Sequence, residues 1–279
     1  MDVPAIVIPA NDESAWIDAC LAALAAQRGV ARARVIVSAN ACTDDTVARA
    51  HAHEGAFAAM GWRLDVIDAP EPGKLAALNR ADAAIDAEGG APARIYLDAD
   101  VRCDPDLVAQ LAEALAPRSP LYATGTLAVA PARTGATRLY ARVWRRLPFV
   151  RGGAVGAGLF AVNRAGRGRW GTFPDIISDD TFVRLHFAPG ERVEVPARYH
   201  WPMVEGWSNL VRVRRRQDAG VRELAARHPE LMANEGKAPL GAGGAARLAA
   251  TDPAGFAVYA GVALAVRARR SDLAWTRGR

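Results

Sequence analysis

Two carboxylates spaced two residues apart follow an apolar segment of the chain. Asp98 and Asp100 end the sequence Arg94-Ile-Tyr-Leu-Asp-Ala-Asp. The backbone turns where a strand ends, so both side chains can face one ligand. Carboxylates, together with water and diphosphate oxygens, are ligands that suit Mg²⁺ or Mn²⁺. The pair therefore predicts a metal site, and the alternative is a solvated loop in which Asp104 and Asp106 cap the next helix.

Polar side chains also follow the three preceding apolar runs. They are, in chain order, Asn11 and Glu13 behind Pro9, then Asn40 and Asp44, then Lys74 directly behind Gly73. Strand ends of a parallel sheet meet at one edge, so these residues would surround Asp98 and form a site for a nucleotide diphosphate. Lys74 is one of two lysines among 35 basic residues. Its rarity and the preceding glycine favour a ligand contact over an ordinary place at a helix start.

The elements that would position these residues alternate regularly over the first 116 residues. Strands are predicted at 3–8, 34–38, 62–67 and 94–97, and helices at 13–27, 43–57, 74–87 and 104–116. This order predicts a doubly wound, mainly parallel sheet covered by helices. The loops that follow the strands would lie along one edge, where such folds bind ligands.

The pattern changes after about residue 117. Strands are predicted at 121–130, 159–163 and 192–195, and helices at 137–146, 178–187 and 206–227. The alternation of the first of these strands is typical of a mixed sheet. Four glycines in the nine residues 236–244 indicate a linker.

Composition excludes several classes of protein. The hydrophobic fraction of 51% and charged fraction of 23% are those of a globular domain, and a net charge of +5 is too mild to indicate nucleic-acid binding. The three cysteines have neither disulfide-framework nor zinc spacing. No G-x-S-x-G, Walker or H-E-x-x-H motif supports a hydrolase, an ATPase or a zinc protease. The N-terminus is not a signal peptide, and the longest uncharged apolar run, 254–266, has thirteen residues where a membrane span needs about 20. We therefore expect a cytoplasmic protein.

With these motifs in order, the chain resembles the family 2 inverting glycosyltransferases with a GT-A fold. The family pattern runs P-x-x-N-E, D-N-x-S-x-D-x-T, G-K-x-x-A-L-N and D-x-D, each behind a strand. The matching segments here are Pro9-Ala-Asn-Asp-Glu13, Asn40-Ala-Cys-Thr-Asp-Asp-Thr46, Gly73-Lys-Leu-Ala-Ala-Leu-Asn79 and Asp98-Ala-Asp100. The resemblance covers roughly residues 3–230. It departs from the family at Ala39, where the family has the aspartate that contacts the base, so the donor's nucleoside stays open.

The resemblance extends to an acid pair in the second half. Ser178-Asp179-Asp180 is similar to the family's [ED]-D-x-x-[LF]-x-x-R-L segment, whose second acid is the general base. This implies that Asp180 is the base and that Asp179 flanks it. Inverting transfer needs one carboxylate to deprotonate the attacking hydroxyl. Capping of a helix behind Ser178 is the alternative, and the two roles are compatible.

Two further features have both a functional and a structural interpretation. Gly156 and Gly158 resemble the acceptor-side loop, where small residues let a sugar approach the backbone; the alternative is a tight turn. His200 follows the last predicted strand at a position where a third metal ligand could sit, whereas a lone histidine is more often structural.

Arg212, Arg215 and Arg216 occupy the place of the family's [RQ]-x-x-R-W motif, without its tryptophan. Arginines at this position could neutralise the leaving diphosphate. The alternative is a solvated basic face of the helix.

The resemblance implies a glycosyltransferase that uses Mg²⁺ or Mn²⁺. Its partners would be a nucleotide-diphosphate sugar and a hydroxyl acceptor, which is a saccharide, a lipid or a small molecule. Residues 1–130 would bind the nucleotide sugar, 131–234 would supply the acceptor site and base within the same domain, and 235–279 would form a linker and helical tail. The alternatives are a nucleotidyltransferase, disfavoured by the absence of a Gly-rich loop after the first strand, and a non-catalytic nucleotide-binding descendant.

The tail itself allows three interpretations. Residues 251–270 carry several large apolar side chains and end in Arg267, Arg269 and Arg270. The apolar residues are Phe256, Tyr259, Val262, Leu264 and Val266. Such a segment can pack across the catalytic domain, form a homodimer, or lie on a membrane surface at its cytoplasmic face. We favour packing or dimerisation, although the resemblance points to a membrane because many relatives act there.

Overall fold

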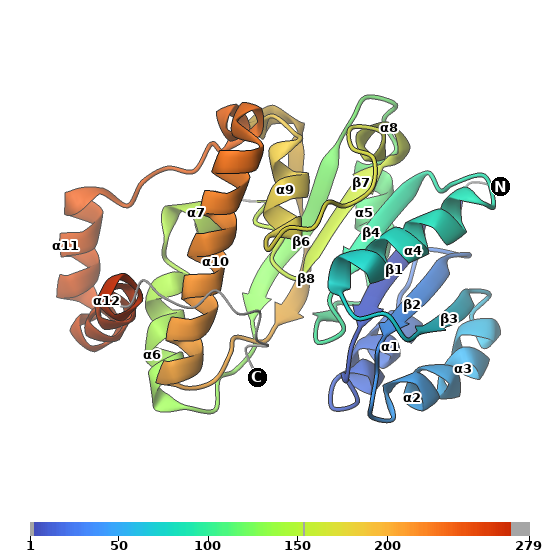
Figure 1. The fold of residues 1–279 in the computed structure, drawn as a ribbon, viewed down its shortest axis with the longest axis horizontal. Coiled ribbons are helices and arrows are strands. Elements are labelled where there is room, and N and C mark those ends of the chain that lie inside the picture. Colours follow the sequence, from blue (N-terminus) through green and yellow to red (C-terminus); the bar gives the residue numbers. More distant parts are fainter. Residues whose placement is uncertain (1–2, 153, 269–279) are drawn as a thin grey trace.

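The computed structural model describes residues 3–152 and 154–268, which form one eight-stranded sheet flanked by helices (Figure 1). The order of the strands across the sheet is β3 (Arg63–Ala69), β2 (Arg34–Asn40), β1 (Ala5–Ala10), β4 (Ala93–Leu97), β7 (Leu159–Asn163), β6 (Tyr122–Val129), β8 (Arg192–Trp201) and β5 (Arg102–Cys103). Strands β3, β2, β1 and β4 are parallel, β7 is antiparallel to β4 and β6, β8 is parallel to β6, and β5 is antiparallel to β8. This confirms the doubly wound, mainly parallel sheet with a mixed second part.

Central strands of the sheet are buried on both faces. In β1, Ile6 and Ile8 belong to the hydrophobic core of one face, and Val7 belongs to that of the other. Strands covered on both sides read as continuous apolar runs, which explains the sequence AIVIPA. One core contains side chains of α1 (Ile17–Ala25), α2 (Thr46–Ala52), α3 (Glu54–Ala59) and α5 (Leu107–Ala114), and the other contains side chains of α4 (Lys74–Asp86) and α9 (Asp179–Leu185).

Most predicted elements differ from the structure by a few residues at their ends, and two differ more. The predicted helix 43–57 is divided into α2 and α3 at His53, whose ring contacts Asp18 at 3.0 Å. Strand β8 continues to Trp201, well past the predicted end at residue 195. Its pairing with β6 shifts register between Gly125 and Thr126, and Pro196 lies in this irregularity. Because proline cannot donate a ladder hydrogen bond, it is tolerated at a bulge, and the strand resumes beyond it.

The C-terminal region is helical, as predicted, and it packs on the rest of the chain. Apolar residues of α12, among them Val262 and Val266, share a core with Tyr140 and Leu210. This is the packing that we favoured for the tail. No helix among the described residues is long and apolar enough to cross a membrane. The elements of this half are α6 (Gly135–Trp144), α7 (Pro148–Arg151), α8 (Arg164–Arg167), the 3₁₀ helices η1 (Pro189–Glu191) and η2 (Pro229–Asn234), α10 (Trp207–Arg227), α11 (Gly241–Thr251) and α12 (Pro253–Ala268).

The glycine-rich segment 236–244 is only partly a linker, because α11 begins at Gly241. In Figure 1, α11 and α12 lie at the end of the molecule farthest from α2 and α3. An ion pair of 2.6 Å between Arg142 on α6 and the buried Asp252, which stands between α11 and α12, fixes this region to α6.

Candidate functional site

Lys74 joins the two halves of the predicted site. Its Nζ lies 2.9 Å from Asp98 Oδ1, just after β4, and 2.9 Å from Asp179 Oδ2, at the first residue of α9. The Asp179 side chain is 9% exposed, whereas those of Lys74 and Asp98 are 39% and 36% exposed. Burial would lower the pKa of Lys74, but the charges of Asp179 and Asp98 outweigh it and raise the pKa well above its usual range. Lys74 is therefore a permanent cation between two carboxylates.

Asp180 stands beside this ion pair. Burial, and then the neighbouring charge of Asp179, raise the pKa of Asp180 above that of an ordinary aspartate, while Lys74 acts in the opposite direction. Its Oδ1 accepts a hydrogen bond of 2.6 Å from the Thr181 amide. A carboxylate whose pKa is raised is a better proton acceptor, which is the property a general base requires.

Helix α10 holds the start of α9 in place. Gly220 lies so close to Ser178 that a Cβ at residue 220 would be 2.1 Å from the Ser178 hydroxyl oxygen. The Ile177 amide donates to Glu223 Oε2 at 2.9 Å. The acid pair is thus positioned by a long helix as well as by Lys74.

The Asn40 side chain connects the loops that follow β1 and β3. Its Nδ2 donates to the Ala10 carbonyl at 2.7 Å, and its Oδ1 accepts from the Gly73 amide at 3.0 Å. Gly73 has a φ of 126°, in the region that favours glycine, and it directly precedes Lys74. Asn11 Nδ2 donates to the carbonyls of Asn40 and Ala41. Both predicted substrate-binding asparagines therefore have a positioning role in this structure.

Asp44 and Glu13 also make hydrogen bonds within these loops. Asp44 accepts from the Thr46 amide and hydroxyl and from the Ser14 amide. Desolvation opposes the effect, but these bonds lower the pKa of Asp44 to about 2. The Glu13 amide donates to the Thr46 hydroxyl at 2.7 Å, and Pro9 is a buried residue of β1.

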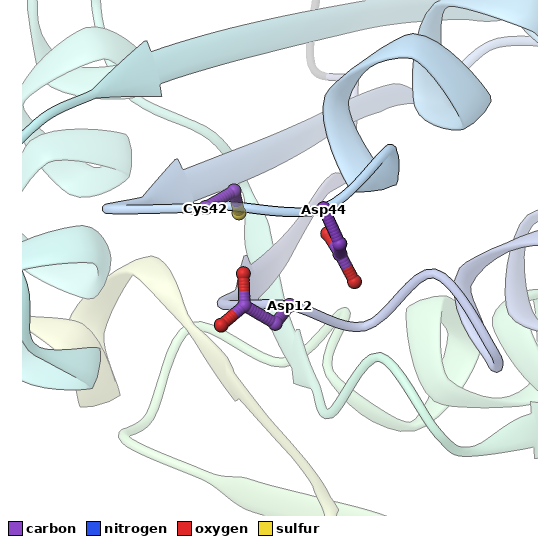
Figure 2. Close-up of side chains that lie close together, drawn as sticks. All are labelled: Asp12, Cys42 and Asp44. Atoms are coloured by element: carbon purple, nitrogen blue, oxygen red, sulfur yellow. The ribbon is translucent and has the colours of Figure 1, made fainter.

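A three-residue group at the same edge resembles a metal site by proximity. Potential ligand atoms of Asp12, Cys42 and Asp44 lie within 4.8 Å of one another, on the loops after β1 and β2 (Figure 2). Asp12 Oδ1 accepts hydrogen bonds from Thr43, and burial raises the pKa of the Cys42 thiol. Since both carboxylates already serve loop geometry and the thiol is neutral, we assign this group a structural role.

The metal role of Asp98 and Asp100 stays a prediction. Asp98 follows the last residue of β4, Asp100 lies two residues further and is 9% exposed, and both carboxylates are hard oxygen donors. The Lys74 ammonium at Asp98 shows that a positive charge is accommodated there. His200, at the end of β8, instead contacts Asp104 Oδ1 at 2.9 Å. Within the part of the chain that the structure describes, it does not form a three-ligand group with Asp98 and Asp100, so its role as a metal ligand stays a prediction.

Gly156 and Gly158 make close contacts inside the protein. A Cβ at Gly156 would lie 1.8 Å from the Tyr122 hydroxyl oxygen, and one at Gly158 would lie 2.7 Å from the Trp201 ring. Both residues have positive φ angles, of 70° and 75°. The structure thus accounts for these glycines by a tight turn, and the Asp98 amide donates to the Gly158 carbonyl at 2.9 Å. Acceptor binding at this loop stays a prediction.

The predicted arginines lie on α10. Arg212 donates to Asn209 on the same helix, and Arg215 donates to the Ala265 carbonyl of α12 at 3.5 Å. Arg216 is half-buried, one turn before Gly220. These contacts do not test a role at the leaving diphosphate, which stays a prediction.

Sequence reasoning did not assign a role to Asn79. Its side chain donates to the Phe173 carbonyl at 3.0 Å and accepts from the Phe173 amide at 2.7 Å. This pair attaches α4, which carries Lys74, to the segment that leads to α9. Asn79 ends the motif Gly73-Lys-Leu-Ala-Ala-Leu-Asn, which the sequence did show, but nothing in its spacing indicated Phe173 as the partner.

Comparison with known proteins gives the same assignment as the motifs. The family model described as glycosyl transferase family 2 matches residues 5–166. No curated protein matches the sequence. Among solved structures, mannosyltransferase PcManGT from Pyrobaculum calidifontis, in complex with GDP-Man and Mn²⁺, has a TM-score of 0.57 at 20% identity, over 96% of this chain and 76% of that chain.

A second relative is TarS from S. aureus. Its 1–349 fragment in complex with UDP has a TM-score of 0.51 at 12% identity, over 78% of this chain and 65% of the fragment. The chain spans 37% of the longer TarS structure. At these identities the likeness shows the fold, which is GT-A.

Proposed function

The chain belongs to glycosyl transferase family 2, and we propose that it transfers a sugar from a nucleotide-diphosphate sugar to a hydroxyl group of an acceptor, with inversion at the anomeric carbon. The observation that carries this proposal is the Lys74 bridge. The Lys74 ammonium contacts both Asp98, on the predicted donor side, and Asp179, which is next to the predicted base Asp180. The reaction needs these two groups on opposite sides of one sugar.

In the proposed mechanism, Asp180 takes the proton of the acceptor hydroxyl. The oxygen forms a bond to the anomeric carbon as the bond to the diphosphate breaks, and the nucleoside diphosphate leaves with the electron pair. Asp98 and Asp100 would hold Mg²⁺ or Mn²⁺, which when bound supplies positive charge to the diphosphate. Lys74 keeps Asp179 in place and contributes a second positive charge beside the leaving group.

The donor is proposed at the level of its class. PcManGT was solved with GDP-Man and Mn²⁺, and TarS with UDP and with UDP-GlcNAc. Ala39, at the family's base-contacting position, is fully buried in this chain. We therefore propose a nucleotide-diphosphate hexose and leave the base to experiment.

A panel of UDP-, GDP- and dTDP-sugars tests the proposal. The protein is incubated with each donor, with Mn²⁺ or Mg²⁺ or with a chelator, and released nucleoside diphosphate is measured. We expect release from one donor class, dependent on the metal, and a product of inverted anomeric configuration by NMR. Pyrophosphate release from a nucleoside triphosphate and a sugar phosphate would instead indicate a nucleotidyltransferase. Donor binding without turnover across a panel of acceptors would indicate a non-catalytic protein.

A further inference from the structure

Two large hydrophobic side chains are exposed among the described residues, and they are neighbours. Trp207, at the start of α10, is 42% exposed, and Leu264, on α12, is 64% exposed. The Trp207 ring lies over Gly261, since a Cβ there would be 2.7 Å from Cη2 of the indole. Leu264 follows Gly261 by three residues, so both lie on one face of α12. We name Trp207, Gly261 and Leu264 the Trp207–Leu264 patch.

The core that anchors α12 does not include Trp207 or Leu264. The opposite face of this helix carries Val262 and Val266, which are buried in the core shared with α6 and α10. Leu264 is not part of this core, and Trp207 of α10 stays 42% exposed although its ring packs against Gly261. An exposed apolar patch on a soluble domain indicates an interaction surface.

The charges around the patch are positive. Arg215 reaches α12 beside Leu264, donating to the Ala265 carbonyl, and Arg267 lies one turn beyond Leu264. Neither α12 nor the first ten residues of α10 contains an acidic residue, and the latter contain four arginines. The sequence after residue 268 adds four more arginines and one aspartate. The excess of arginine near the patch therefore favours a partner that is anionic as well as apolar.

The patch begins at the edge of the sheet that carries the candidate site. Strand β6 runs in the same direction as β4, because each is antiparallel to β7, and β8 is parallel to β6. The end of β8 thus lies at the same edge as Asp98, and α10 starts six residues later with Trp207. The patch therefore begins at the same edge of the sheet as Asp98.

We propose that the Trp207–Leu264 patch docks the protein on a membrane surface that contains anionic lipids. Tryptophan favours the boundary between headgroups and acyl chains, leucine enters the apolar layer, and arginines attract the headgroups. The protein lies on the membrane and does not span it. Docking itself does not depend on the proposed transfer, although it would give that reaction access to an acceptor carried by a lipid.

Vesicle co-sedimentation of the full chain, without donor or metal, tests the docking. Vesicles of equal parts phosphatidylglycerol and phosphatidylcholine are compared with vesicles of phosphatidylcholine alone. The variants are Leu264→Asp and Trp207→Ser, and the control is Ala19→Asp, which adds the same charge at an exposed position of α1. Thermal melting checks that each variant is folded, and Arg267→Gln, at an exposed position of α12, tests the charge independently.

We expect the wild-type chain to bind the anionic vesicles and to bind less at high salt. Each patch variant should bind about tenfold more weakly or worse, while Ala19→Asp binds as the wild type does. Absence of wild-type binding, or equal binding by the wild type, Leu264→Asp, Trp207→Ser and Ala19→Asp, would overturn the proposal. Sedimentation velocity in the absence of vesicles identifies the competing occupant. A wild-type dimer that the patch variants convert to monomer would assign the patch to self-association and also overturn membrane docking.

Discussion

Replacing Lys74 by methionine removes the cation between two carboxylates and keeps a side chain of similar length. Each lost ion pair would cost about 0.2–1 kcal/mol if it were fully exposed, and 3–5 kcal/mol if it were fully buried. Here Lys74 is 39% exposed and Asp179 is 9% exposed, so the pair is intermediate. We expect a loss of about 1–2 kcal/mol in the free energy of unfolding at neutral pH.

The pKa of Lys74 decides at which pH the loss of stability should be measured. Because the folded protein raises that pKa, the ion pairs contribute fully below the ordinary lysine pKa and are lost only as pH rises through the raised value. Neutral pH therefore reports the whole effect. Urea unfolding provides the measurement. Lys237→Met is the matched control, since Lys237 is the other lysine of the chain and pairs with Glu235.

The same substitution should change ligand binding in two opposite directions. Without nucleotide, Mn²⁺ no longer has to displace an ammonium group from Asp98, so its affinity should rise about fivefold, the equivalent of about 1 kcal/mol. With Mn²⁺ present, affinity for the nucleoside diphosphate should fall because a positive charge is lost. Calorimetry measures both. Unchanged stability together with unchanged Mn²⁺ affinity would refute the reasoning, because the ion pairs would then have no energetic role.

Five other changes test the remaining parts of the site and the fold. Asp180→Asn should reduce the rate of sugar transfer by about 10²–10⁴-fold while donor affinity is kept. The wild-type rate should rise with pH to a plateau, with an apparent pKa above that of an ordinary aspartate. If Asp180→Asn transfers sugar at the native rate, another residue is the base. Asp98→Ala and Asp100→Ala should each weaken Mn²⁺ binding, the second more, and unaltered calorimetric titrations would contradict the metal assignment. Asp44→Ala should destabilise the fold by about 1 kcal/mol at neutral pH, a difference that disappears as pH falls towards 2, because the lowered pKa of Asp44 stabilises only its ionised form. A chain that ends at Leu240 loses the α12 core and should melt about 10 °C lower or more, and an unshifted melting temperature would show that the packing of α12 is energetically neutral.

The sheet could be predicted because its signals are local. Strands β1, β2 and β4 are short, mainly apolar runs, and β3 mixes apolar and charged residues over a similar length. These patterns do not depend on distant partners. The end of β8 could not be predicted in this way. Pro196 indicates that a strand stops, and only the pairing with β6 shows that it resumes after a bulge.

At the site, too, features with a local signal could be predicted, and contacts between distant residues could not. The sequence indicated that Lys74, Asp98 and Asp179 belong to a site, because each stands at the end or start of an element. It gave no reason to pair Lys74 with Asp179, since the residues are distant in the chain and the contact depends on how α4 and α9 pack. Asn40 was predicted to bind substrate because of its place in a motif, whereas the hydrogen bonds that its side-chain amide makes in the structure are to other residues of the protein.

Cys42, in the loop after β2, allows covalent labelling of the sheet edge that carries the candidate site. Cys20 and Cys103 are buried, whereas Cys42 is partly exposed between Asp12 and Asp44 (Figure 2). A maleimide reagent should therefore modify Cys42 first in the native protein, slowly because burial raises the pKa of this thiol, and the other two cysteines only on unfolding. The unaltered chain thus contains one thiol whose rate of modification reports occupancy of the loops and two whose modification reports global opening.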